Sequence, residues 1–278
     1  MRRIIAIMAD MHSGSSLGLL TPNTVLIDDA GAPWVPNLGA TQANFLWPSY
    51  ETALLEVLSL ADGDPITLIH NGDICQGDRH GPLISPLLAD QVTIALANLE
   101  PWFALGNIER LYLLNGTEAH DYSGGSAERM VGKALAESVE VRYCAHLLLD
   151  IGEQEIDVAH HGPHPGSRKW LEGNIARFYL RDRMLGEIGR GRTPPALYVR
   201  AHRHQPIDET LSMYSRTSRI MIVPSWQAAG QYVRAVAQSL PHICCGMAAV
   251  EVLDGRIAQV HKYVYELDIR TEDNLDDG

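Results

Sequence analysis

Apolar and polar positions alternate along the chain in blocks that indicate strands followed by helices. Arg3–Ala9 is an almost continuously apolar run, which is typical of a strand buried on both faces. From Ser49 onward, Leu54, Val57 and Leu58 recur at helical spacing and predict an amphipathic helix. The same patterns predict strands at Pro65–His70, Arg110–Leu114, Val141–Asp150, Glu155–Ala159, Ala196–Ala201 and Arg219–Pro224, and helices opening at Ser85, Ser126 and Ser167.

The second half of the chain changes character. A helix is expected from about Ser167 to Ile188, with an inward face made of Trp170, Leu171, Ile175, Tyr179 and Leu185. Met247–Leu253 and Ile257–Leu267 are expected to form a hairpin, because Asp254-Gly255 between them is a turn signal. Early strand–helix alternation and late hairpins predict an α/β fold of mixed sheets covered by helices. No repeat or linker divides the chain, so residues 1–270 are expected to form one domain.

The segment 13–48 has no helical or strand periodicity and is rich in Gly, Pro and Asn. A loop of this length inside a compact domain is usually functional or disordered. Its position directly after Asp10 and His12 favours a lid or substrate wall over a surface excursion. Trp34, Phe45 and Trp47 would then line a pocket, or equally pin the loop to the core.

The composition is that of an ordinary globular protein, with 46% hydrophobic and 20% charged residues among 278. The net charge of −12 argues against a general nucleic-acid surface. An anionic substrate remains compatible with this charge, because bound dications would reverse the field locally. Part of the negative charge lies in an acidic tail, residues 271–278.

Compartment signals are few. The four cysteines have neither zinc-finger spacing nor the pattern of a disulfide framework. The first nine residues imitate a signal peptide, but the apolar run is short and ends at Asp10 without a convincing cleavage site. No run approaches the roughly 20 apolar residues that cross a bilayer. A reducing, cytoplasmic setting without membrane attachment is therefore expected.

Five short polar clusters each follow an expected strand, and these carry the chemistry. They are Asp10-Met11-His12, Gly72-Asp73, Gly116-Thr117-Glu118-Ala119-His120-Asp121, His160-His161-Gly162 and His202-Arg203-His204. Polar residues at the carboxyl ends of strands in an open α/β sheet converge on one crevice. In extended chain, residues two apart point the same way, so D-x-H and H-x-H each offer two ligands to one side.

The residue types indicate which ions these clusters would bind. Mixed carboxylate and imidazole ligands suit Mn, Fe, Zn, Ni or Co better than Mg or Ca, which prefer oxygen alone. Asp73 is able to bridge two ions through its two carboxylate oxygens. Two metals about 3.5–4 Å apart clamp the attacking and leaving oxygens of a phosphoryl displacement.

The order of these motifs resembles the calcineurin-like metallophosphoesterase family, whose pattern is D-x-H, G-D, G-N-H-D/E, a histidine and G-H-x-H. The resemblance covers about residues 2–205, although Ala201 stands where glycine is usual and Gln76 stands where the family often has aspartate. It implies a four-layer α/β/β/α sandwich of two mixed β-sheets flanked by helices. The dimetal site would lie at the sheet edge.

The resemblance also implies ligands, carried over motif by motif. Asp10, His12 and His204 would hold the first of two divalent transition-metal ions, and Asp73 would bridge both ions. The identity of the metals, manganese among them, is open.

The second ion would be held by His161 and His202. His160 is the alternative to His161, which is favoured because the family histidine is commonly followed by glycine.

The third motif departs from the family. Two extra residues intervene, and the ligand Asn is missing. Glu118 is the strongest nearby donor and is expected to replace it, with Thr117, Asn115 and a water as weaker candidates.

His120-Asp121 still matches the end of the third motif. The resemblance therefore implies that His120 protonates the leaving group and that Asp121 orients it, while a metal-bridging hydroxide attacks phosphorus in line. Arg79 or Arg203 would bind a phosphate oxygen, although a surface role fits each arginine equally well.

The sequence thus predicts a dimetal-dependent phosphoester hydrolase, and a phosphodiesterase acting on small or medium organic phosphates or nucleotides is favoured. The alternative is a catalytically silent binding or adaptor module on the same fold, for which the altered third motif argues. Natural substrate and oligomeric state are not readable, and the acidic surface argues against long nucleic acid.

Overall fold

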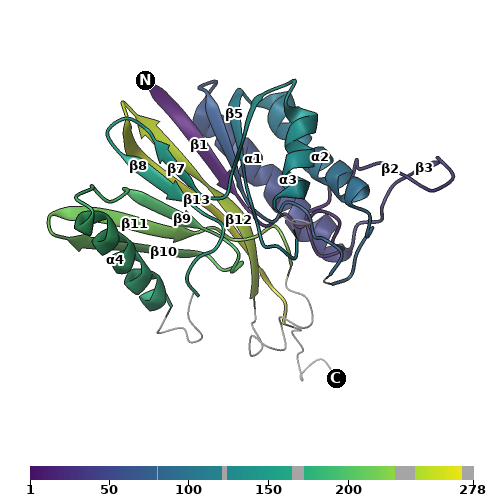
Figure 1. Cartoon of the computed structure of the whole chain (residues 1–278). Helices are drawn as coiled ribbons and strands as arrows, with labels where there is room; N and C mark the ends of the chain where they lie inside the picture. Colours follow the sequence, from purple (N-terminus) through teal and green to yellow (C-terminus); the bar gives the residue numbers. More distant parts are fainter. Residues whose placement is uncertain (80, 121–123, 165–171, 229–241, 271–278) are drawn as a thin grey trace, which may run out of the picture.

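Two mixed β-sheets form the centre of the molecule in a computed structural model that describes residues 1–79, 81–120, 124–164, 172–228 and 242–270 (Figure 1). The first sheet has the spatial order β13 (Arg256–Asp268), β12 (His242–Leu253), β1 (Arg2–Met8), β4 (Ile66–Asn71), β5 (Ile108–Leu114) and β6 (Glu140–Cys144). Strands β1, β4, β5 and β6 are parallel, whereas β12 runs antiparallel to β1 and β13 antiparallel to β12. The parallel strands therefore bring their carboxyl ends to one edge.

The second sheet has the order β10 (Ile207–Met213), β11 (Arg216–Ile222), β9 (Leu197–Arg200), β8 (Glu155–Val158) and β7 (Leu147–Asp150). Its central strands β8, β9 and β11 are parallel, and the outer strands β7 and β10 are antiparallel to their neighbours. The chain is thus of the α/β class with mixed sheets, as the sequence predicts.

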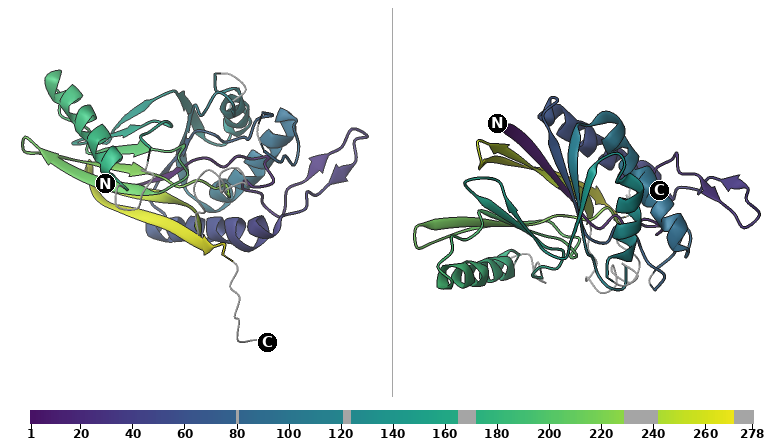
Figure 2. Two further views of the ribbon diagram at one scale, coloured as in Figure 1. Left: turned by 90° about the horizontal axis from the view of Figure 1, so that it is seen from below. Right: turned by 45° about the horizontal axis from the view of Figure 1, so that its top comes forward.

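Helices lie on the outer faces of both sheets. Three of them, α1 (Trp47–Ala61), α2 (Leu88–Leu105) and α3 (Ser126–Leu135), share a buried apolar cluster with the first sheet. On the far side of the molecule, α4 (Asn174–Gly189) packs against β10 and β11 through a smaller cluster (Figures 1 and 2). A further cluster, to which both sheets contribute, fills the space between them.

The alternation of side chains along β1 explains this layering. Ile4, Ala6 and Met8 face the helices, whereas Ile5 and Ile7 face the second sheet. Because both faces of the strand are covered, its sequence is continuously apolar rather than alternating.

The segment 13–48 is partly ordered against the core. Phe45, in the π-helix Gln42–Leu46, is buried, and Trp47 packs against the same cluster. Trp34 lies 38% exposed on a short hairpin, β2 (Leu26–Ile27) and β3 (Pro33–Trp34), which projects from the body (Figure 2). Phe45 and Trp47 thus pin the segment, and its role as a lid stays a prediction.

The expected inward face of α4 is wrong at two residues, although Tyr179 packs against the buried cluster as predicted. Ile175 and Leu185 are 43% and 40% exposed, whereas Ala176, Leu180 and Met184 are buried against the sheet. Apolar residues occur on two sides of this helix, so the spacing alone does not select the buried side. The expected residues 170 and 171 and the tail 271–278 lie outside the described part of the chain. Among the described residues, no helix is both long and apolar enough to cross a membrane.

Candidate metal centre

The loops that leave β1 and β4 run side by side beyond the ends of these strands. The amide of Asp10 donates to the Gly72 carbonyl at 3.0 Å, and the amide of His12 donates to the Asp73 carbonyl at 3.0 Å. An isolated parallel bridge a little further along continues this pairing. The D-x-H and G-D motifs are therefore held in register by backbone hydrogen bonds, independently of any ligand.

The second sheet delivers its motifs to the same place. The amide of Ala201, after β9, donates to the carbonyl of His160, after β8, at 2.9 Å. The amide of His202 then donates to Oδ2 of Asp10 at 3.2 Å, which ties the loops of the two sheets together. Four of the five sequence clusters thus meet at one edge.

Left-handed backbone marks the residues of these loops. A non-glycine residue in this conformation is disfavoured by about 1–2 kcal/mol, and such strain concentrates at functional sites. Of the nine non-glycine residues with positive φ in the described part of the chain, five belong to the clusters, namely Asp10 (53°), His12 (47°), Asp73 (55°), His202 (70°) and His204 (56°).

The first donor group consists of Asp10, His12 and His204. The two Nε2 atoms lie 3.3 Å apart, and Oδ1 of Asp10 lies 3.3 Å from Nε2 of His204 and 3.8 Å from Nε2 of His12. Within the described structure, this buried carboxylate oxygen has no hydrogen-bond partner. A buried oxygen left without a hydrogen bond is costly, and facing two imidazole nitrogens it forms a donor set that fits a transition-metal ion.

The second donor group consists of His160, His161 and His202, whose ring nitrogens all lie within 4.8 Å of one another. His160 is buried, His202 is half-buried and His161 is exposed. The structure therefore brings both sequence alternatives, His160 and His161, to the same cluster.

His160 is the better anchored of the two. Its Nδ1 donates to the carbonyl oxygen of Asn71 at 2.6 Å, because a carbonyl only accepts, and its Nε2 lies 3.1 Å from Oδ2 of Asp73. Metal-binding histidines usually donate their second ring N–H in this way. The geometry therefore favours His160 as the metal ligand, whereas the sequence favours His161 because Gly162 follows it.

Asp73 lies between the two donor groups. It is 1% exposed and forms one set of possible metal donors with His12 and His120 and another with Asp10 and His160. A carboxylate in this position can offer one oxygen to each of two ions.

The charges of the centre reinforce one another. Burial lowers the pKa of His160, but its hydrogen bond with Asp73 and the charges of Asp10 and Asp73 outweigh burial and raise this pKa to about 9. Burial also raises the pKa of both carboxyl groups, yet neighbouring histidines hold each pKa below its usual value. Burial, together with the charges of His160 and His161, lowers the pKa of His202 to about 4. Two ionised carboxylates thus face one cationic histidine, a net negative charge that favours a cation.

The third motif differs from the sequence prediction. Glu118 is exposed and belongs to none of the donor groups found among the described residues. Thr117, which precedes it, points its hydroxyl at the second donor group. The side chain of Asn115 lies beside Gly125. The loop after β5 thus places the less basic of two adjacent donors inward, which charge and ligand strength alone do not predict.

His120 lies beside the first donor group. Its ring meets that of His12 edge to face with centroids 4.7 Å apart, and its Nδ1 donates to the Gln76 carbonyl at 2.5 Å. This carbonyl therefore fixes which ring nitrogen carries the proton in the neutral form. Asp121, which the sequence assigns to that task, lies outside the described residues.

The two arginines expected to bind substrate are both exposed. Arg203 lies close enough to His161 for its charge to help lower the pKa of that histidine, after burial and the charge of His160. Arg79 follows the Gly72-Asp73 loop, but no contact places it at the centre. Substrate binding by either arginine stays a prediction.

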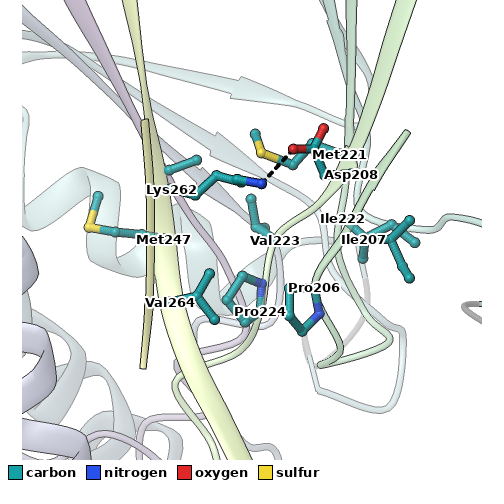
Figure 3. Close-up of a pocket in the computed structure, with 11 residues that line it drawn as sticks. Pro206, Ile207, Asp208, Met221, Ile222, Val223, Pro224, Met247, Lys262 and Val264 are labelled. Carbon is teal, nitrogen blue, oxygen red and sulfur yellow. Dashed lines mark hydrogen bonds and ion pairs between the residues drawn. The ribbon is translucent and has the colours of Figure 1, made fainter. Parts of the chain in front are cut away.

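An apolar cavity of about 340 Å³ lies between strands of the two sheets (Figure 3). Strands β10, β11, β12 and β13 supply its walls, and Pro206, two residues after His204, contributes to one of them. Its charged lining residues are Asp208 and Lys262, which pair across the sheets at 2.7 Å. The cavity is therefore an apolar space with its polar groups already satisfied by each other.

The sequence patterns do not predict two residues that support the centre, Asn71 and Trp226. Asn71 accepts from His160 and donates its own side-chain amide to the carbonyl of Ala159 at 3.1 Å. The amide of Trp226 donates to the Asp10 carbonyl at 3.0 Å. Both act largely through the backbone, so no residue pattern signals them; only the position of Asn71 next to the G-D motif was available as a hint.

Comparisons with known proteins identify no family for this chain. No model of a protein family matches the chain, and no curated protein matches it in sequence. Among solved structures, the chain is similar to Thermus thermophilus sulfate thiohydrolase SoxB in complex with glycerol, with a TM-score of 0.41 and 10% identity. The match covers 96% of this chain and 56% of SoxB, so this chain spans about half the length of that protein. A similarity this distant assigns no family.

Proposed function

We propose that the chain is a dimetal-dependent phosphoester hydrolase of the calcineurin-like metallophosphoesterase type. One observation carries the proposal: the buried carboxylate of Asp73 shares one set of possible metal donors with His12 of the first group and another with His160 of the second group. This is the arrangement expected of a bridging ligand for two ions.

The layering of the molecule supports the same proposal. Helices α1 to α3 cover one sheet and α4 covers the other, with an apolar cluster between the sheets. We propose that this is the four-layer α/β/β/α sandwich implied by the motif order. The donor groups lie where the parallel strands β1, β4, β8 and β9 end.

The first ion would be held by Asp10, His12 and His204, whose donor atoms converge without hydrogen-bond competition at Oδ1 of Asp10. Asp73 would contact both ions.

The second ion would be held by His160 and His202, with His161 beside them. His160 takes precedence over His161 because Asn71 fixes its ring. The mixed nitrogen and oxygen donors suit Mn, Fe, Zn, Ni or Co. When bound, two such ions supply Lewis-acid stabilisation of the charge that develops on a phosphoryl group.

The residues of the chain would complete the reaction. Water adds to phosphorus, and the bond from phosphorus to the ester oxygen breaks. His120 in its imidazolium form gives the Nε2 proton to the departing oxygen and regains a proton from solvent, while the water proton passes to solvent. The Gln76 carbonyl holds His120 by Nδ1, which leaves Nε2 as the atom that transfers the proton. Arg203, exposed beside His161, would bind a phosphate oxygen.

The net charge of the chain supports a small substrate. A chain with a net charge of −12 is a poor surface for long polyanions. Small or medium organic phosphates, diesters in particular, are therefore proposed as substrates.

The test is hydrolysis of bis(p-nitrophenyl) phosphate by metal-depleted protein after addition of Mn²⁺ or Ni²⁺. Turnover is expected with added metal, and Asp73→Asn is expected to abolish it together with the uptake of two ions. Asp62→Asn, at the exposed end of α1, is the matched control and should leave both unchanged. Folded protein that hydrolyses no phosphoester with any of the five metals would instead be a binding module.

A further inference from the structure

The hydroxyl of Thr117 is surrounded by atoms that bind metals. Its Oγ1 lies 3.2 Å from Oδ2 of Asp73, 3.3 Å from Nε2 of His160 and 3.1 Å from Nδ1 of His202. These three partners come from three different loops, and each belongs to the proposed second metal position or to the bridge. Thr117 therefore adds a further oxygen donor to the side chains around that position.

The backbone holds this hydroxyl in place. The amide of Thr117 donates to Oδ1 of Asp73 at 2.6 Å, so one residue contacts both oxygens of the carboxylate. Gly116 permits this approach, because a Cβ atom there would collide with Asp73. The loop after β5 is thus built around Asp73, with the hydroxyl as its inward end.

The four atoms carry too few hydrogens to satisfy one another by hydrogen bonds. The hydroxyl has one hydrogen and three possible acceptors, so it satisfies one of them. Nδ1 of His160 already donates to Asn71, so in the neutral ring Nε2 has a lone pair and no hydrogen. In this deprotonated state, which metal binding requires, several lone pairs converge on one point, and a single cation satisfies them together.

The neighbouring candidates do not reach this point. Glu118 is exposed, and the side chain of Asn115 lies beside Gly125. Among the described residues of this motif, Thr117 is the one whose side-chain polar atom contacts the second donor group.

We infer that the Thr117 hydroxyl is a ligand of the second metal ion, where the metallophosphoesterase pattern has a carboxamide. The inference rests on the proposed dimetal function. A neutral hydroxyl that shares its proton with Asp73 is a weaker donor than an amide oxygen, so the second ion is held less tightly than it would be with an amide at this position.

The test is metal binding, independent of turnover. Thr117→Val removes the hydroxyl and preserves the shape of the side chain. Titration of metal-depleted protein with Mn²⁺ should show two ions for the wild type. For Thr117→Val, the first affinity should be retained and the second weakened about 10- to 100-fold, which is the range for losing a group that supports a metal site.

Two further substitutions separate the ligand from its surroundings. Thr117→Ser keeps the hydroxyl and should retain the second ion, whereas Thr117→Asn supplies the amide oxygen and should restore or strengthen it. Glu118→Gln is the matched control on the adjacent residue and should not change either affinity. Melting temperatures without metal establish that each variant is folded.

The outcomes are distinct. If the wild type binds two ions and Thr117→Val binds both with unchanged affinity, the inference is overturned while the dimetal proposal stands. Weakening by Glu118→Gln but not by Thr117→Val would assign the position to Glu118. If the folded wild type binds no Mn²⁺, Ni²⁺, Zn²⁺, Co²⁺ or Fe²⁺, the proposed function fails and the inference fails with it.

Discussion

The carbonyl oxygen of Asn71 accepts the Nδ1 proton of His160 at 2.6 Å, across 89 residues of sequence. The side-chain amide of Asn71 also reaches the carbonyl of Ala159, the residue before His160. The last residue of β4 therefore positions the loop after β8 twice, and it turns Nε2 of His160 towards Asp73. This link between the two sheets favours His160 over His161 as the ligand of the second ion.

We predict that His160→Asn removes the second metal ion, whereas His161→Asn weakens it by a smaller factor. His160 is buried and anchored, and its loss leaves Asp73 without its imidazole partner at 3.1 Å. Metal content after dialysis at low free Mn²⁺ measures the difference. Greater loss in His161→Asn would reverse the assignment.

We predict that binding of the second ion releases about one proton near pH 7. A metal ligand must be deprotonated, and the pKa of His160 is raised to about 9, mainly by Asp73 against the opposing effect of burial. His160 is therefore protonated below pH 9 before the ion binds, and the affinity should rise with pH until about 9 and then level off. Calorimetry in buffers with different ionisation enthalpies measures the released protons.

The same group makes metal-depleted protein sensitive to pH. Because the folded pKa of His160 lies above the ordinary value of 6.5, its contribution to stability is fully present below about pH 6.5 and is lost as the pH rises through 9. Denaturant unfolding between pH 6 and 10, with chelator present, should show this loss. His160→Asn should flatten the dependence over that window, and an unchanged slope in the variant would assign it to another group.

We predict that His120→Asn lowers turnover of a phosphodiester about 100-fold or more, in the range typical of general acid catalysis, while the protein still binds two metal ions. The ring is held by the Gln76 carbonyl rather than by the second donor group. His242→Asn, at the exposed start of β12, is the control and should have wild-type activity. Loss of an ion together with activity would make His120 a ligand.

Gly72 offers a test of the local geometry. Gly72 and Gly63 have the same φ of 86°, but a Cβ atom at Gly72 would collide with the His160 ring, whereas the space at Gly63 is open. Gly63→Ala should therefore cost only the backbone strain, about 1–2 kcal/mol. Gly72→Ala should cost more and should also weaken metal binding, which urea unfolding and Mn²⁺ titration measure. Equal effects at both positions would contradict the close packing of Gly72 on His160.

Much of the centre was predictable because its donors come directly after strands. Asp10 and His12 follow a continuously apolar run that clearly predicts a buried strand. Parallel strands bring such residues to one edge of the sheet. The choice between Thr117 and Glu118 was not predictable, because it depends on how the loop after β5 bends around Asp73. The same applies to His160, whose anchor is a backbone carbonyl.

The fold was predictable to a similar extent. The strand and helix order of the first sheet follows from apolar periodicity, except that the expected strand Val141–Asp150 is divided into β6 of the first sheet and β7 of the second. Strand β10 was not expected, because Ile207–Met213 is half-buried and carries four polar residues between its apolar ones. The buried face of α4 was misassigned because both of its sides contain large apolar residues, and the burial of Leu180 is decided by contact with the sheet.

The left-handed backbone at five of the donor residues fixes the directions of their side chains before any ion binds. Folding alone preorganises these side chains, so an incoming ion meets a rigid cage and needs little reorganisation of the polypeptide. Selectivity among metals would then be governed by the fixed size of that cage, and the surrounding loops are free to diversify around it for new substrates.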